Sequence, residues 1–146
     1  MSIETTIIGI DPDSDRHGVA IYRRGKLKEL AMMTTIQLLE AVEKEGDCLL
    51  SIENTLHSGG LYTKNQNSSR KVRDKIAMAT GKCQQAQAEL QRWLDHHTVA
   101  YILHKPGKYN WAKPANKPVF ESVTGWKKQS NEDTRSAAYY GFLALN

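Results

Sequence analysis

The order of apolar segments along this chain limits its fold more than any other feature. Three segments that are β-branched or alternate apolar with polar residues stand close together near the start: TTIIGID, HGVAIYR and KLKELAMM. They predict three antiparallel strands. CLLSIEN and, at 99–103, VAYIL are short apolar runs typical of two further strands. With helical segments between and after them, the order βββαβαβα predicts an α/β fold, a mixed five-stranded sheet flanked by helices.

The most regular helical pattern lies between residues 71 and 97. Its apolar residues recur in steps of four and three and form one stripe along a helix: Val72, Ile76, Ala79, Cys83, Ala86, Leu90 and Trp93. Such a stripe packs into a core or supplies a dimer face, and the pattern leaves both open. Gly81 lies inside this helix at a cost of about 1 kcal/mol relative to Ala, which favours close packing against another backbone there.

Three shorter helices complete the expected order. Residues 35–45 carry Ile36, Leu39 and Val42 at helical spacing, and Gly46 follows them. KPVFESVTGW indicates a short helix, and NEDTRSAAYYGFLAL indicates the last one. A chain of 146 residues with 40% hydrophobic residues predicts a single domain over 1–146.

The cysteines and the N-terminus indicate where such a protein works. Cys48 and Cys83 fall in a predicted strand and a predicted helix, which argues against a disulfide scaffold and favours a reducing, cytoplasmic location. The start, MSIETTIIGID, suits neither a signal peptide nor a membrane span, so no membrane partner is expected.

The positive charge is concentrated in two windows of the sequence. Residues 57–83 and 104–128 together hold twelve basic and two acidic residues, a net charge of +10, while the remainder has a net charge of −6. An acidic body with two cationic segments is typical of a protein that binds a phosphate backbone. A pair of solvated, lysine-rich loops would produce the same pattern.

Three carboxylates stand where predicted elements begin or end. Asp11 ends the first strand, and Glu53 follows the buried run CLLSI. Asp133 lies in the first turn of the last helix, on the face predicted to be buried, whereas Glu132 is turned aside by about 100°. The alternatives are two ordinary strand-end acids and a capping box formed by Ser130 with Asp133.

If the three carboxylates converge, a divalent cation has to offset their mutual repulsion. Hard oxygen ligands suit Mg²⁺ or Mn²⁺, and two such ions about 3.5–4 Å apart can clamp a phosphodiester. A calcium loop starting at Asp11 is excluded, because Arg16 and Tyr22 stand where Gly and Glu are required. Zinc is not supported, since Cys48, Cys83 and the His96–His97 pair lack ligand spacing.

Taken together, these motifs resemble the RuvC family of Holliday junction resolvases, within the ribonuclease H-like superfamily. The segments GIDPDSDRHGVAI, SIEN, GKCQQAQAEL, KPGKYNWAK and NEDTRSAAYYGFLAL follow the family's order and cover nearly the whole chain. The compact form is more similar to the phage-encoded branch than to the bacterial one, and a phage origin would put the protein in the host cytoplasm.

The resemblance implies a crossover junction endodeoxyribonuclease, a homodimer that makes paired nicks in a four-way DNA junction with Mg²⁺ or Mn²⁺, two ions per active site. Asp11, Glu53 and Asp133 match the family's catalytic and metal-binding acids. Ser136 stands where the family has a second acid or His on the last helix, so one of the two metal sites is weaker, and Glu132 is a weak alternative ligand. The resemblance also leaves open a related nuclease acting on forks, flaps or RNA:DNA hybrids, and a branched-DNA binding module with a decayed active site.

The DNA-binding side chains are expected in and after the two cationic windows. Aromatic residues would stack on unpaired bases, and basic residues would contact phosphates. The candidates are Tyr62, Lys64, Arg70, Lys71, Arg73, Lys105, Lys108, Trp111 and Lys113, with Leu56 and Tyr109 as further apolar or aromatic contacts.

Overall fold

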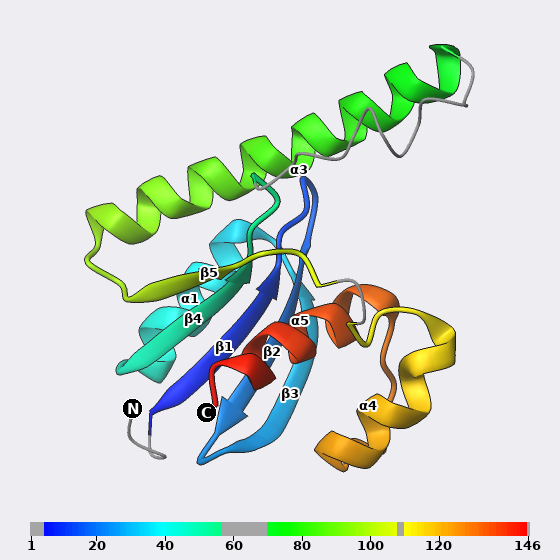
Figure 1. Cartoon of the computed structure of the whole chain (residues 1–146). Helices are drawn as coiled ribbons and strands as arrows, with labels where there is room; N and C mark the ends of the chain where they lie inside the picture. Colours follow the sequence, from blue (N-terminus) through cyan, green and yellow to red (C-terminus); the bar gives the residue numbers. More distant parts are fainter. Residues whose placement is uncertain (1–4, 57–69, 108–109, 146) are drawn as a thin grey trace.

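The computed structural model of the protein describes residues 5–56, 70–107 and 110–145 (Figure 1). Its strands are β1 (Thr6–Asp11), β2 (His17–Arg23), β3 (Lys26–Met33), β4 (Cys48–Glu53) and β5 (Tyr101–His104). Its helices are α1 (Thr35–Glu45), α3 (Arg70–His96), α4 (Lys117–Thr124) and α5 (Glu132–Leu143), and the short 3-10 turn η1 (Pro114–Asn116) precedes α4.

The five strands form one mixed sheet in the order β3-β2-β1-β4-β5. The first three strands pair antiparallel, whereas β4 runs parallel to both β1 and β5. The predicted fold class is therefore confirmed. Because β1, β4 and β5 are parallel, their C-terminal ends lie at one edge of the sheet, and the turn from β1 into β2 lies at the same edge.

Alternation along the central strands supplies a core on each face of the sheet. Ile8 and Ile10 of β1 point to the face covered by α1 and α3, while Ile7 points to the face covered by α5. This is the period-two pattern of a strand that is buried on both sides. Both cores contain fully buried aliphatic side chains, each of which contributes roughly 1.5–3 kcal/mol through removal from water.

Glycines allow α5 to lie unusually close to the sheet. A Cβ at Gly9 would overlap the backbone of Ala137 and Gly141, and a Cβ at Gly18 would overlap the backbone of Asp133. Two hydrogen bonds fix the helix at this depth, from the Tyr22 hydroxyl to the Ala138 carbonyl and from Ser51 Oγ to the Tyr140 carbonyl, both 2.6 Å long. As a result, the first turn of α5 lies over the ends of β1 and β2.

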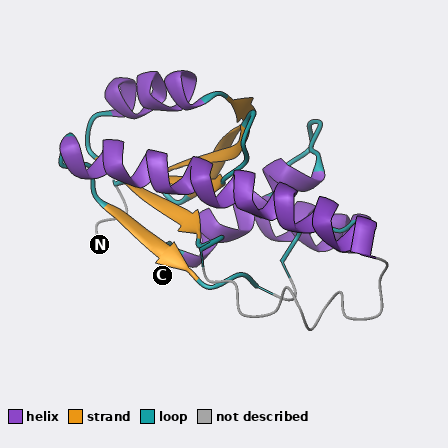
Figure 2. Ribbon diagram, turned by 90° about the horizontal axis from the view of Figure 1, so that it is seen from above, coloured by secondary structure: helices purple, strands orange, loops and turns teal. Residues whose placement is uncertain are grey.

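Among the α3 side chains that the structure describes, those that pack on the sheet lie in the C-terminal half of the helix. Leu90 and Leu94 are buried and Trp93 is partly buried against the same core, whereas Met78, in the other half, is 64% exposed. Figures 1 and 2 show that the N-terminal half extends beyond the strands. The predicted stripe is thus a core face in its second half. Among the residues that the structure describes, a Cβ at Gly81 would meet nothing within 4 Å, so the close packing predicted there is not found among them.

Two predicted details of helix ends and faces also differ from the structure. In α1 the buried residues are Leu38 and Val42. Ile36, which the spacing placed on the apolar face, is 70% exposed, because the first turn of the helix faces solvent. At the start of α5 the capping box joins Asn131 and Thr134, with hydrogen bonds of 2.8 and 2.9 Å, which excludes the alternative of a box formed by Ser130 with Asp133. The cap does not use the Asp133 carboxylate.

None of the helices in the described parts of the chain combines the length and the apolar character needed to span a bilayer.

Candidate active site

The candidate site lies where β1, β4 and the first turn of α5 meet. Asp11 is the last residue of β1 and Glu53 is the last residue of β4, and these two strands are parallel neighbours. Asp11 pairs with Gly18 on its other side, and the backbone of Asp133 rests on Gly18. The glycine contact thus sets the distance between the first turn of α5 and the Asp11 strand.

The carboxyl groups of Asp11 and Glu53 share a hydrogen bond. Burial, followed by the charge of Glu53, raises the pKa of Asp11 to about 9. Burial and the charge of Asp133 also raise the pKa of Glu53, although its hydrogen bond with Asp11 acts in the opposite direction. A proton between the two carboxyls therefore offsets the repulsion that two ionised carboxylates would exert on each other.

Asp133 lies at the margin of this pair and acts on it through its charge. Its carboxylate is half-buried, and burial, Asp13 and Glu132 raise its pKa. Within residues 5–56, 70–107 and 110–145, no three His, Cys, Asp or Glu side chains lie close enough together to form a complete set of metal ligands. The described site consists of a contacting pair, Asp11 and Glu53, with Asp133 beside it.

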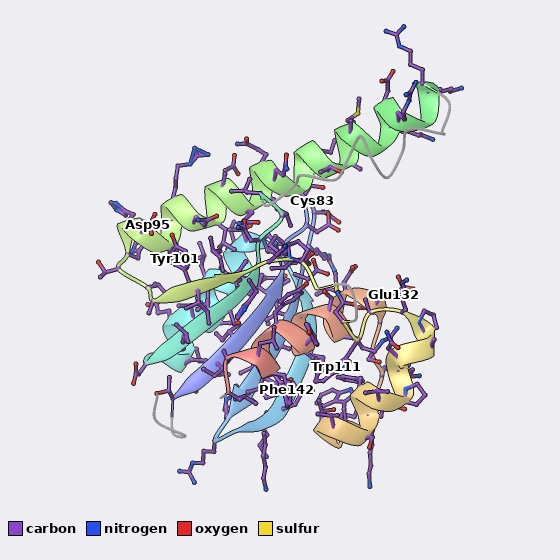
Figure 3. All side chains as sticks on the ribbon, viewed as in Figure 1. Cys83, Asp95, Tyr101, Trp111, Glu132 and Phe142 are labelled. Atoms are coloured by element: carbon purple, nitrogen blue, oxygen red, sulfur yellow. The ribbon has the colours of Figure 1, made fainter. Side chains whose placement is uncertain are left out.

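Ser136 is one turn further along α5 and reaches the same pair. Its side chain is 2% exposed and forms a hydrogen bond with Asp11 that lowers the pKa of that carboxyl. Glu132, by contrast, is exposed and lies at the outer side of the helix start (Figure 3). Of the two weak candidates, Ser136 is the one that contacts the acidic pair.

Hard oxygen donors and a surplus of negative charge make this a suitable environment for Mg²⁺ or Mn²⁺. The raised pKa of Asp11 supports the same conclusion, because a bound cation would offset the repulsion between the carboxyls that a proton offsets here. The residues present thus fit a divalent cation at Asp11 and Glu53, with Asp133 and the Ser136 hydroxyl next to them.

The turn after β1 is held by a histidine that the sequence pattern did not single out. His17 is buried, its Nδ1 accepts the Asp13 backbone N–H at 3.1 Å, and its Nε2 is 2.9 Å from Thr35 Oγ1. Asp13 accepts a hydrogen bond from the Ser14 N–H, as a turn residue does, while its charge reaches Asp133. Asp15 is exposed, so of the three aspartates only Asp11 belongs to the acidic pair.

A second polar link joins β4, β5 and α5 next to Glu53. His104 pairs with Glu53 across the two strands, and its Nε2 lies 2.7 Å from Ser51 Oγ, which donates to the Tyr140 carbonyl. A hydroxyl within the buried run CLLSI is the sequence signal for such a link, because a buried polar side chain requires a partner.

The predicted DNA-binding residues fall into three groups. Arg70, Lys71 and Arg73 are exposed on the projecting half of α3, and Lys105 and Lys113 are exposed beyond β5. Tyr62, Lys64 and Lys108 lie outside the described residues, as does Tyr109. Leu56 is described and is 46% exposed.

Trp111 does not serve as a stacking surface for bases. Its ring is 6% exposed and lies between α4 and α5, against Phe120 and Phe142 (Figure 3). Its carbonyl accepts a hydrogen bond from Arg135 Nε at 3.1 Å, and Arg135 also reaches Ala112 and Ser130. The prediction for Trp111 is corrected because the side chain fills the core under α4.

The architecture is that of the ribonuclease H-like fold. The chain is similar to two structures of RuvC from Thermus thermophilus, one of them in complex with a Holliday junction substrate. Each superposes with a TM-score of 0.61 over 97% of this chain, at 13% sequence identity, and the match covers 93% and 94% of those chains respectively.

The resemblance noted in the sequence is therefore confirmed at the level of the fold. No family model matches the sequence. No curated protein matches it either.

Proposed function

We propose that this protein is a divalent-metal-dependent endonuclease that resolves four-way DNA junctions, acting as a homodimer that makes paired nicks. The observation that carries the proposal is the contact between the partly buried carboxyls of Asp11 and Glu53, at the edge of a ribonuclease H-like sheet, with Asp133 beside them. The match to RuvC supports DNA as the substrate, because one of the RuvC structures contains a Holliday junction substrate.

The distribution of charge supports a nucleic acid as the substrate. Exposed basic residues gather on the projecting half of α3 and in the segments that follow β5, whereas the site itself is acidic. Phosphate contacts of this kind supply affinity without sequence specificity and hold the backbone near the carboxylates. The exposed candidates are Arg70, Lys71, Arg73, Lys105 and Lys113, and Tyr62, Lys64 and Lys108 are proposed from the sequence.

For catalysis, Asp11 and Glu53 would hold the cation, with Asp133 and the Ser136 hydroxyl as the next groups in reach. When bound, divalent cations supply activation of water and neutralisation of the charge that builds up on the phosphodiester. The protein's part is to hold the two carboxyls in fixed positions, where a cation would take the place of the proton that they share. Ser136 assists, because its hydrogen bond favours the ionised form of Asp11.

The test compares cleavage of a synthetic four-way junction, a fork, a linear duplex and an RNA:DNA hybrid, with Mg²⁺ or Mn²⁺. Symmetric paired nicks in the junction are the expected result. Asp11→Asn and Glu53→Gln should abolish cleavage and keep junction binding. Asp15→Asn is the matched control, because Asp15 is an exposed aspartate of the same turn. Cleavage at the wild-type rate by either site variant contradicts the proposal.

Two further outcomes would redirect the proposal. Cleavage of forks or hybrids in preference to junctions indicates a related nuclease with another substrate. Junction binding without cleavage at any Mg²⁺ or Mn²⁺ concentration indicates a binding module, an alternative that the neutral Ser136 favours. Sedimentation at micromolar concentration tests the homodimer, and a monomer there counts against paired nicking.

A further inference from the structure

Gln87 marks the boundary between the projecting half of α3 and the half that packs on the sheet. Among the α3 side chains that the structure describes, it is the first buried one from the N-terminus, and it is 0% exposed. A buried amide in a helix face that is otherwise apolar requires hydrogen-bond partners, so its contacts indicate what the helix is attached to.

The Gln87 side chain clamps the two residues that follow Glu53. Its Oε1 accepts from both the backbone N–H and the hydroxyl of Thr55, at 2.6 Å each. Its Nε2 donates to Asn54 Oδ1 at 3.0 Å and to Gln91 Oε1 at 2.8 Å. All four hydrogen-bonding positions of the amide are used, and the backbone donor of Thr55 excludes the flipped orientation.

Neighbouring contacts strengthen the same attachment. Gln84 Nε2 donates to the Thr55 carbonyl at 3.2 Å, so α3 holds both backbone groups of that residue. On the other side, the Asn54 N–H donates to the His104 carbonyl at 2.7 Å. The chain after Glu53 is therefore held between β5 and α3.

The backbone of Glu53 is paired within the sheet on one side only. The pairing of β1 with β4 ends at Ile10 and Ile52, so β1 offers no strand pairing to Glu53. The pairing with His104 on β5 remains. The next contact is the Thr55 N–H, which donates to the Glu53 carbonyl at 3.1 Å and is held by the Gln87 amide.

We propose that Gln87 is a positioning residue, through which α3 holds Glu53 in the orientation required for the acidic site. This inference rests on the proposed nuclease function. It implies that the basic half of α3, where DNA is proposed to bind, is mechanically joined to one of the catalytic carboxylates. Partners that orient metal ligands typically change metal affinity or activity by about 10–100-fold when they are removed.

The experiment compares Gln87→Met, which keeps the side chain's length and removes its hydrogen bonds, with Thr55→Val, which removes only the hydroxyl donor. Gln85→Met is the matched control, because Gln85 is exposed on the same helix and bonds only to Glu89 among the contacts described. Circular dichroism and thermal melting establish that each variant is folded. Because Thr55→Val is the milder change, it keeps the test available if Gln87→Met does not fold.

In Gln87→Met we expect kcat on the junction to fall by about 10–100-fold and the Mn²⁺ dissociation constant to rise by about tenfold. KM for the junction should change by less than about twofold, because the basic residues of α3 are untouched. Thr55→Val should show a smaller loss of the same kind, and Gln85→Met none. The exchange rate of the Thr55 amide proton, followed by NMR, should increase in Gln87→Met and report the clamp independently of activity.

The outcomes separate this inference from the proposed function. A wild-type protein that neither cleaves a junction nor binds Mn²⁺ overturns the proposed function, and this inference with it. A wild-type protein that cleaves, with Gln87→Met and Thr55→Val retaining the wild-type kcat and Mn²⁺ affinity, overturns the positioning role alone. A loss shared equally by kcat and the fraction of folded protein means that Gln87 supports the fold and does not position Glu53.

Discussion

The carboxyl groups of Asp11 and Glu53 share a hydrogen bond although they come from strands that are 42 residues apart in the sequence. In the unfolded chain the Asp11 carboxyl has the ordinary pKa of 3.8, and folding raises this pKa to about 9. An acid whose pKa is raised by folding stabilises the folded state at low pH, and this contribution is lost as the pH rises through the folded pKa. Without a cation, the protein should lose stability between about pH 4 and pH 9.

Replacement of Asp11 by Asn removes this cost. A change of one pKa unit corresponds to about 1.4 kcal/mol, so we expect Asp11→Asn to stabilise the metal-free protein by ~1–3 kcal/mol at neutral pH. Chemical denaturation at several pH values, in the presence of a chelator, measures the effect. The gain should be small at about pH 4 and larger at higher pH, and Asp15→Asn should show none. If Asp11→Asn is less stable than the wild type at neutral pH, ionisation of Asp11 does not destabilise the folded protein and the prediction is wrong.

The close approach of α5 to the sheet yields a prediction about glycines. Gly18→Ala should force the backbone of Asp133 away from β2, because the added Cβ would overlap it. We expect a loss of stability of about 1–3 kcal/mol, as in overpacked cores, together with weaker binding of Mn²⁺. Gly81→Ala is the matched control, since that position is helical and has no neighbour within 4 Å among the described residues. It should stabilise the protein by up to about 1 kcal/mol.

Thermal melting and Mn²⁺ titration distinguish these two glycine variants. If Gly18→Ala melts and binds Mn²⁺ like the wild type, then α5 is free to move outward at no cost, and the glycine contact does not position Asp133. If Gly81→Ala is destabilising, the projecting half of α3 packs against something outside the described residues of this chain.

Ser136 gives a prediction in the direction of improved function. It is buried and hydrogen-bonded to Asp11, in a position where a carboxylate would reach the same cation. Because affinity for divalent cations rises with the charge of the ligand set, Ser136→Asp should tighten Mg²⁺ binding by about tenfold and destabilise the metal-free protein. Ser136→Ala, which only removes the hydrogen bond, should weaken binding.

Calorimetry with Mn²⁺ and the Mg²⁺ dependence of junction cleavage test the Ser136 prediction. Equal affinities in the wild type, Ser136→Asp and Ser136→Ala would mean that position 136 does not face the cation. A gain in affinity without a gain in cleavage would place the added carboxylate at a site that does not serve catalysis.

The sequence predicted the strands and their order well because their signals are local. Period-two alternation and β-branched runs identified β1, β2 and β3, and the apolar run at 48–53 identified β4. The same reasoning singled out Asp11 and Glu53, because an acid that ends a buried strand must reach solvent or a compensating charge, and the structure brings the two carboxyls into contact. Asp133 was singled out from the helical wheel, and in the structure its charge raises the pKa of Asp11.

The remaining features depend on contacts between segments that are distant in the sequence. Trp111 reads as a loop aromatic, and only the packing of α4 against α5 shows that it belongs to the core. The stripe of α3 has the same local pattern along its whole length, so its division into a packed and a projecting half depends on where the sheet ends. Gln87 and Ser51 left one signal each, a polar residue among apolar ones, but their partners lie 32 and 53 residues away.

The basic residues on the projecting half of α3 yield the last prediction. Arg70, Lys71 and Arg73 are exposed there, far from the hairpin that joins β2 to β3 (Figure 1). Each phosphate contact releases condensed counterions, so each Ala substitution that removes a contact should reduce the slope of log affinity against log salt by about 0.9. Lys26→Ala, in the hairpin, is the matched control and should leave the slope unchanged. Fluorescence anisotropy of a labelled four-way junction at a series of salt concentrations measures these slopes of log affinity against log salt. Calcium replaces magnesium in the buffer to prevent cleavage. The cleavage rate at saturating DNA should be nearly the same as in the wild type, because these three variants bind DNA more weakly but leave the acidic site unchanged. A slope that is the same in the wild type and in Arg70→Ala, Lys71→Ala and Arg73→Ala would show that DNA approaches the site without contacting α3.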